Sequence, residues 1–184
     1  MTRSPFYLAL GLLFFLSISA CSPRLTPFTE DLQEEFGWSE RELKKIQFYV
    51  SRTIVLRREY KKGSSEIISG KIKMVDGKSV DEVVIESGTP GVVLFQPKTN
   101  RLAVSFEEGG KERFLMFGPN PKADDKYVLL ASSWNKREGK VTYENKSWFT
   151  PTQSAYSALM VDLRKIRKTR VSSRRADGRT VKSK

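Results

Sequence analysis

Short segments in which every second side chain is apolar recur between residues 46 and 163, and turn-forming residues separate them. In one clear example, Leu102, Val104 and Phe106 alternate with Arg101 and Ala103. Such alternation places the apolar side chains on one face of a strand, while Gly, Pro, Asn and Asp between the segments are typical of tight turns. Strands at this near-regular spacing predict a mainly β fold, a small antiparallel barrel or sandwich of about eight strands.

The expected strands cover residues 46–56, 67–75, 80–85, 92–95, 102–106, 113–117, 127–131, 141–143 and 148–149, with 158–163 as a further candidate. The first is expected to be one long strand, bent near Ser51. The second and third flank Asp76-Gly77, a dipeptide that type I′ turns prefer because both central residues need positive φ. We therefore expect a β-hairpin around this dipeptide.

Two short helices are expected before the first strand. Residues 28–36 carry apolar side chains at four-residue spacing, with a Thr that can cap the first turn and a Gly directly after the segment. Ser39 and Glu42 have the spacing of a capping box, in which each side chain binds the other residue's backbone N–H. This spacing predicts a second helix over 40–45.

The first 21 residues have the three parts of an export signal: a short start carrying Arg3, an apolar segment over 6–16, and small residues before a cut site. The last six of them, Leu16-Ser17-Ile18-Ser19-Ala20-Cys21, resemble a bacterial lipobox. In lipoproteins, cleavage would fall between Ala20 and Cys21. The thiol of the new first residue then carries a diacylglycerol, and its amine carries a third acyl chain such as palmitate. The resemblance implies that Cys21 is a lipidation site.

A plain secretory signal and an uncleaved membrane helix are the alternatives. The helix fits less well, since the apolar run over 5–20 is shorter than the ~20 residues that a membrane span needs. Cys21 is the only cysteine, so no disulfide competes for its thiol. A single acyl chain binds a membrane only marginally, whereas two or three chains hold a protein there stably.

The residues around the cut site and in the following segments resemble those of outer-membrane lipoproteins. In well-studied Gram-negative systems, Asp after the modified cysteine favours retention in the inner membrane, and here that position is Ser22. Ser22-Pro23-Arg24-Leu25 also lacks the acidic cluster of a surface-export signal. Uncharacterised lipoproteins of Bacteroidota resemble this chain in three segments: Trp38-Ser39-Glu40, 43–50 and 54–59. The resemblance spans most of the mature chain and implies an outer-membrane location, on the periplasmic face, without a known activity.

These patterns divide the chain into four parts. Residues 1–20 are expected to be a signal peptide, 21–27 a lipidated linker, 28–168 a single β-rich domain with N-terminal helices, and 169–184 a disordered basic tail. Apolar residues make up 39% of the chain and aromatic residues 11%, which is enough for a folded core. The core is expected to hold without a disulfide.

The chain contains no histidine. Catalysis by a histidine acid or base, including a Ser-His-Asp triad, is therefore excluded. A zinc site is not expected either, because it would need histidine or cysteine ligands beyond the one acylated thiol. We expect no metal and no cofactor.

Most of the net charge of +12 lies at the C-terminus. From Arg164 onward ten basic residues face the single acid Asp177, whereas the rest of the chain is nearly neutral. The residues expected to bind an anion are Arg164, Lys165, Arg167, Lys168, Arg170, Arg174 and Arg175. Export makes nucleic acid an unlikely partner, which leaves lipid headgroups, an anionic envelope polymer or an acidic protein surface. The alternative is a tail that only aids solubility.

Aromatic residues in the C-terminal hairpins suggest a second kind of site. If Trp134, Tyr143 and Trp148 were exposed, their rings could stack on the sugars of a glycan. The alternative, which we favour, is that these rings fill the core, because aromatic side chains bury the most area.

A glycosidase that uses two carboxylates could draw them from three acidic pairs: Asp81-Glu82, Glu107-Glu108 and Asp124-Asp125. They fall in or beside expected turns, where acids are commonly solvated. Two functions stay open: a non-enzymatic binding or scaffolding module of the cell envelope, and a histidine-free hydrolase acting on an envelope glycan or peptide with carboxylates alone. The lack of a Gly-rich or nucleophile-elbow motif favours the first.

Overall fold

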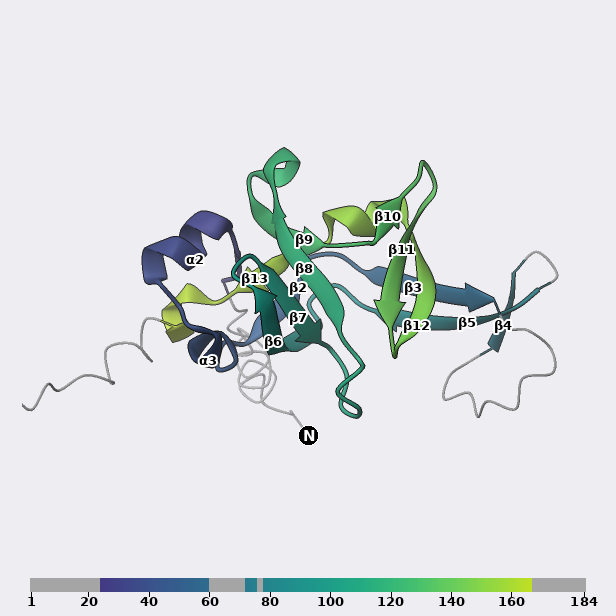
Figure 1. Ribbon diagram of the computed structural model, residues 1–184, viewed down its shortest axis with the longest axis horizontal. Coiled ribbons are helices and arrows are strands. Elements are labelled where there is room, and N and C mark those ends of the chain that lie inside the picture. Colours follow the sequence, from purple (N-terminus) through teal and green to yellow (C-terminus); the bar gives the residue numbers. More distant parts are fainter. Residues whose placement is uncertain (1–23, 60–71, 76–77, 167–184) are drawn as a thin grey trace, which may run out of the picture.

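The computed structural model describes residues 24–59, 72–75 and 78–166, and it is mainly β (Figure 1). Its strands form two antiparallel sheets. The first has seven strands, in the order β1 (Thr26–Pro27), β13 (Leu159–Val161), β2 (Phe48–Val50), β6 (Pro90–Lys98), β7 (Arg101–Ser105), β8 (Leu115–Asn120) and β9 (Lys126–Leu129). The second has six, in the order β10 (Ser133–Trp134), β11 (Glu138–Tyr143), β12 (Lys146–Pro151), β3 (Ile54–Glu59), β5 (Lys78–Ile85) and β4 (Ile72–Val75).

The mainly β, antiparallel prediction is confirmed, but the described strands do not form a closed barrel, and they outnumber the expected eight. The first sheet nevertheless curls, because its two edges meet through isolated contacts. The backbone N–H of Tyr127 donates to the carbonyl of Phe28 over 2.9 Å, and that of Glu30 donates to the carbonyl of Asp125 over 3.1 Å. A bridge also pairs Val128 with Ala158. These contacts bring β9 beside the first strands of the chain.

The two predicted helices are present as α2 (Glu30–Phe36) and α3 (Glu40–Leu43). The Thr29 hydroxyl accepts from the N–H of Leu32 over 3.1 Å, and Gly37 ends α2 in the left-handed conformation with φ 57°. Ser39 and Glu42 form the expected capping box. Two 3₁₀ turns, η1 (Pro121–Ala123) and η2 (Thr152–Tyr156), and one α-helical turn over 163–166 complete the helical elements of the described chain.

Two expectations about the N-terminal half are wrong. The segment 46–56 is two strands, β2 and β3, which belong to different sheets. The chain turns between them at Ser51, whose N–H donates to the carbonyl of Ala158 over 2.9 Å and whose hydroxyl accepts from the N–H of Ala158 over 2.8 Å. Thr26–Pro27, expected in the linker, is strand β1 and pairs with β13.

The predicted hairpin is present as β4 and β5, with Val75 opposite Lys78, while Asp76-Gly77 itself lies outside the described residues. The candidate strand over 158–163 is confirmed in part as β13. It lies between β1 and β2 in the first sheet. The expected disordered tail over 169–184 lies outside the described residues.

Phe28 lies at the centre of the core between the helices and the first sheet. Its side chain is fully buried, and its ring centroid lies 4.8 Å from that of Tyr127, 5.2 Å from that of Phe48 and 6.0 Å from that of Trp38. The same hydrophobic cluster includes Trp148 from the second sheet. One continuous core therefore joins the helices and both sheets.

We expect Phe28→Ala to lower the free energy of unfolding by about 3–5 kcal/mol, because it removes a ring that contacts three other aromatic side chains. Chemical denaturation followed by circular dichroism measures the change. Phe149→Ala is the matched control, since that ring is 38% exposed and its loss should cost far less. Equal losses for the two variants would contradict the central role of Phe28.

Candidate functional site

The predicted lipidation site, Ala20-Cys21, lies outside the residues that the structure describes. Described structure begins at Arg24, and β1 begins two residues later. Within the ranges 24–59, 72–75 and 78–166, no helix is long and apolar enough to cross a membrane.

Two of the predicted anion-binding residues, Arg164 and Lys165, are described, and both are exposed in the α-helical turn over 163–166 that follows β13. The Arg164 guanidinium donates to both carboxylate oxygens of Asp162, over 3.2 Å from Nε and 3.1 Å from Nη2. Hydrogen bonding from Arg164 lowers the pKa of Asp162. The remaining members of the set lie outside the described residues: Arg167, Lys168, Arg170, Arg174 and Arg175.

The structure does not assemble the three aromatic residues into a glycan platform. Tyr143 and Trp148 are each only 2% exposed, because they lie on the inner face of the second sheet, and their ring centroids are 6.1 Å apart. The Trp148 indole N–H donates to the carbonyl of Tyr143 over 3.0 Å. These two residues belong to the core, and only Trp134 keeps an exposed surface, at 37%.

The Trp134 ring covers the backbone of Gly139, its partner across the β10–β11 pair. A Cβ atom at position 139 would lie 2.4 Å from two ring carbons, which is closer than packed atoms approach. Glycine is therefore needed for this ring position, an arrangement in which an aromatic side chain shields a strand glycine. Trp134 has a structural role as well as an exposed edge.

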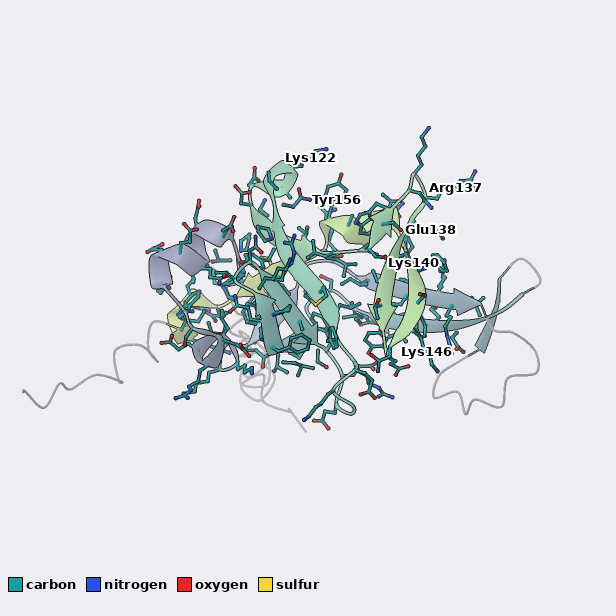
Figure 2. All side chains as sticks on the ribbon, viewed as in Figure 1. Lys122, Arg137, Glu138, Lys140, Lys146 and Tyr156 are labelled. Carbon is teal, nitrogen blue, oxygen red and sulfur yellow. The ribbon has the colours of Figure 1, made fainter. Side chains whose placement is uncertain are left out.

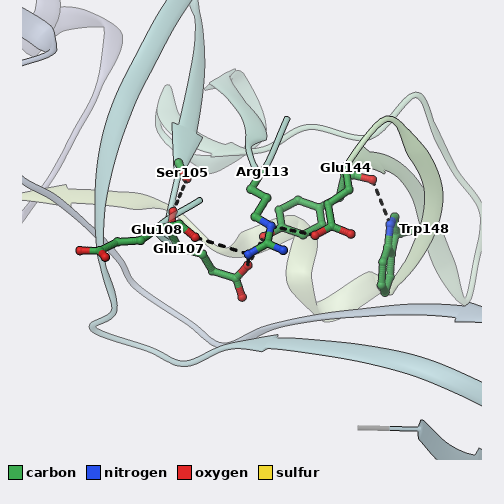
Figure 3. Close-up of polar contacts among 7 residues, drawn as sticks. Ser105, Glu107, Glu108, Arg113, Glu144 and Trp148 are labelled. Carbon is green, nitrogen blue, oxygen red and sulfur yellow. Dashed lines mark hydrogen bonds and ion pairs between the residues drawn. The ribbon is translucent and has the colours of Figure 1, made fainter. Parts of the chain in front are cut away.

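A cluster of charged residues lies between the β7–β8 loop and the β11–β12 turn (Figure 3). The Arg113 guanidinium contacts Glu144 over 2.9 Å and Glu107 over 3.8 Å. It also donates to the carbonyl of Glu108 over 3.4 Å. Sequence reasoning missed Arg113 and Glu144, since neither belongs to a motif. Because the two segments belong to different sheets, the cluster links one sheet to the other.

Glu144 occupies the left-handed region, with φ 50°, in the two-residue turn between β11 and β12. This conformation is uncommon for residues with a side chain, and it persists where neighbours hold it. Here its N–H donates to the carbonyl of Glu112 over 3.0 Å, and its carboxylate binds Arg113. The contact across the sheets therefore offsets the backbone strain of the turn.

Tyr143 connects this cluster to the core. Its hydroxyl donates to Oε2 of Glu107 over 2.7 Å. Burial, followed by this hydrogen bond, raises the pKa of Tyr143 above its ordinary value. Tyr127 is similar: its hydroxyl donates to Oε1 of Gln33, and burial raises its pKa. Both phenols are held in the protonated form.

A second charged group lies inside the second sheet. Arg58 of β3 and Asp81 of β5 are paired across the strands, with Nη2 of Arg58 2.9 Å from Oδ2 of Asp81. The guanidinium carbon lies 5.4 Å from the centre of the Trp148 ring, within cation–π range. Asp81 is 4% exposed, so the arginine neutralises a buried charge.

The acidic pairs do not converge on one site. In the first pair, Asp81 binds Arg58 on the inner face, while Glu82 binds Arg57 over 2.9 Å on the outer face of the same strand. Asp124-Asp125 lies in the turn before β9, where both residues have positive φ. Within the described ranges, no group of three or more His, Cys, Asp or Glu side chains is placed to hold a metal ion.

Comparisons of this chain with protein-family models, with curated proteins and with solved structures find no match.

The raised pKa values of Tyr127 and Tyr143 predict how tyrosine ionisation and protein stability change at alkaline pH. In the folded protein these two phenols should stay protonated above pH 10.0, the ordinary pKa of a tyrosine. Their stabilising effect is complete below pH 10.0 and falls as the pH rises further, by about 1.4 kcal/mol per pH unit per group, because the unfolded chain then loses these protons and the folded chain keeps them. Spectrophotometric titration of tyrosinate absorbance measures the first effect, and denaturation at several alkaline pH values measures the second.

Tyr143→Phe should remove one tyrosine whose pKa is raised. The free energy of unfolding should then fall less steeply as the pH rises above 10.0. Tyr156→Phe is its control, since the Tyr156 side chain is 54% exposed and lies outside the core. If Tyr143→Phe and Tyr156→Phe had the same effect on the alkaline loss of stability, the buried hydrogen bond of Tyr143 to Glu107 would be contradicted.

We expect Gly139→Ala to displace the Trp134 ring, cost about 1–3 kcal/mol of stability and shift tryptophan emission to longer wavelength. Fluorescence of the folded protein measures the shift, because Trp38 and Trp148 are buried and Trp134 supplies the exposed component. In a Trp134→Phe background, the same alanine should leave the emission unchanged. An emission shift that persists there would show that another tryptophan had moved.

Proposed function

We propose that the protein is a lipid-anchored, non-enzymatic binding or scaffolding module of the bacterial outer membrane, on its periplasmic face. The lipobox at 16–21 supports the anchor, and the residue after Cys21 supports the choice of membrane. The basic residues from Arg164 onward support an anionic partner.

The observation that carries the proposal is the short distance in the chain between Cys21 and the fold. The first sheet begins at Thr26, so only Ser22, Pro23, Arg24 and Leu25 intervene. The five steps from Cys21 to Thr26 span at most about 18 Å, even when fully extended. An acylated Cys21 would therefore hold the folded domain directly against the lipid surface. This arrangement suits a protein whose partners are within or next to the membrane.

The Arg113 cluster is the observation that keeps a carboxylate-based hydrolase as the second candidate. It brings two carboxylates, Glu107 and Glu144, to opposite sides of one guanidinium (Figure 3). A glycosidase needs the space between its two carboxylates for the scissile bond. Here Arg113 occupies that space, and the arrangement serves the contact between the sheets better than catalysis. We therefore favour the binding module.

We expect Cys21→Ala to abolish membrane anchoring when the chain is expressed in a Gram-negative bacterium, because no acyl chain can be attached without the thiol. Membrane fractionation and mass spectrometry of the N-terminal peptide measure the effect. Ser22→Asp is the matched control: it should keep the acyl chains and move the protein toward the inner-membrane fraction. A wild-type protein with an unmodified Cys21 or an uncleaved signal would overturn the proposal.

A further inference from the structure

The pairing of β1 with β13 brings the two ends of the described fold together. Thr26 lies opposite Val161, so Leu25 and Asp162 are the next positions at the same end of the strand pair. On the other side of β13, Phe48 of β2 also lies opposite Val161. The segments before β1 and β2 and the segment after β13 therefore share one end of the first sheet.

Six basic residues lie at this end of the sheet, which we call the basic end. They come from the approach to β1, from α3 and the residues after it, and from the α-helical turn over 163–166 after β13. All six are exposed: Arg24, Arg41, Lys44, Lys45, Arg164 and Lys165. Three acids lie among them, and each is engaged locally: Glu40 with Lys44 over 2.6 Å, Glu42 in the capping box of α3, and Asp162 with Arg164. The chain leaves the described fold here at Ile166, and basic residues continue in the sequence after it.

The opposite end of the same strands carries four acids, with Lys122 and Lys126 beside them, and Lys126 binds Asp124 over 2.9 Å. The backbone hydrogen bond from Glu30 to Asp125 joins the start of α2 to the turn before β9, and Asp31 and Asp124 are their neighbours in sequence. In Figure 1, α2 lies above α3, so the acidic end and the basic end face opposite ways. A negatively charged surface would therefore attract the basic end more strongly than the acidic end.

We propose that the basic end is the membrane-facing surface of the protein, where its cationic side chains bind the anionic headgroups of the leaflet that holds the acyl chains of Cys21. This inference rests on the proposed lipid anchor. Arg24 lies three residues from Cys21, so an acylated cysteine places the basic end, rather than the acidic end, at the lipid surface. Each Lys or Arg close to an anionic surface strengthens association about fivefold.

Lipid headgroups fit this position better than the other envelope anions. The chain between Cys21 and the basic end is too short to carry these residues far from the lipid, and unscreened attraction reaches only about 8–10 Å at physiological salt. The basic end and the acyl chains would then act together, and the domain would stand on the membrane in one orientation. The acidic end, which lies above α3 in Figure 1, would face the periplasm, and the second sheet would lie to one side of the first.

The test uses the full acylated chain, purified from membranes and reconstituted in vesicles. With Cys21 acylated, an introduced cysteine is the only free thiol and can carry a fluorophore. Lys45→Cys labels the basic end, and Lys122→Cys is its matched control, an exposed lysine on the turn labelled in Figure 2, away from α3. Nitroxide-labelled headgroups should quench position 45 strongly and position 122 weakly in vesicles that contain phosphatidylglycerol. The difference should shrink in phosphatidylcholine alone and at high salt.

Charge reversal then tests the cations themselves. The double variant Arg41→Glu, Lys44→Glu should weaken binding of the basic end to anionic vesicles by at least about 25-fold, which is fivefold for each lost cation. The control double variant Lys136→Glu, Arg137→Glu should have no effect on this binding. Equal quenching at 45 and 122, or quenching at 45 that ignores anionic lipid, would overturn the inference. Binding of purified sacculi that depends on Arg41 and Lys44, without quenching at 45, would assign the basic end to peptidoglycan instead. Mass spectrometry of the same preparation separates the two proposals: an unmodified Cys21 refutes the anchor, whereas an acylated Cys21 without oriented quenching refutes only the docking surface.

Discussion

The insertion of β13 between β1 and β2 is the contact on which the first sheet depends. The three strands are short, and β1 has only two residues, so none of them would be stable without the others. Their pairing brings Phe28 under the sheet, where Phe48 and Tyr127 close around it. The edge bridges to β9 then complete the curl of the sheet. The helices are held to this core by Phe28 and Trp38, since each helix is too short to be stable alone.

The sequence pattern predicted the existence of most strands, because alternation is a local property of the chain. It could not assign them to sheets, since strands of both sheets have the same two-residue period. The division of 46–56 at Ser51 depends on hydrogen bonds to Ala158, a residue that is distant in sequence. Strand β1 is too short to show any period. Caps were predicted correctly for a related reason: Ser39 and Glu42 interact within a single turn.

The candidate sites follow the same division between local and non-local information. Alternation places Trp148 and Phe149 on opposite faces, but only the fold shows that Trp148 faces inward. The Arg113 cluster was invisible in the sequence, because its carboxylates come from two separate turns and no spacing rule connects them. The segment 16–21 that resembles a lipobox is continuous in sequence, so a lipid anchor could be proposed without the fold. The basic end needed both kinds of information. The sequence shows its charged residues, and the β1–β13 register shows that they share one end of the sheet.

The same register has a consequence for the timing of folding. Because Thr26 pairs with Val161, the N-terminal strand has no partner until nearly the whole domain has left the ribosome. Contacts between residues so far apart form slowly, since a long loop must close before they contribute. The helices and local hairpins can appear earlier, but the central sheet cannot be completed by a partial chain. For the exported protein that we propose, this delay would be an advantage, because early folding would block passage across the membrane.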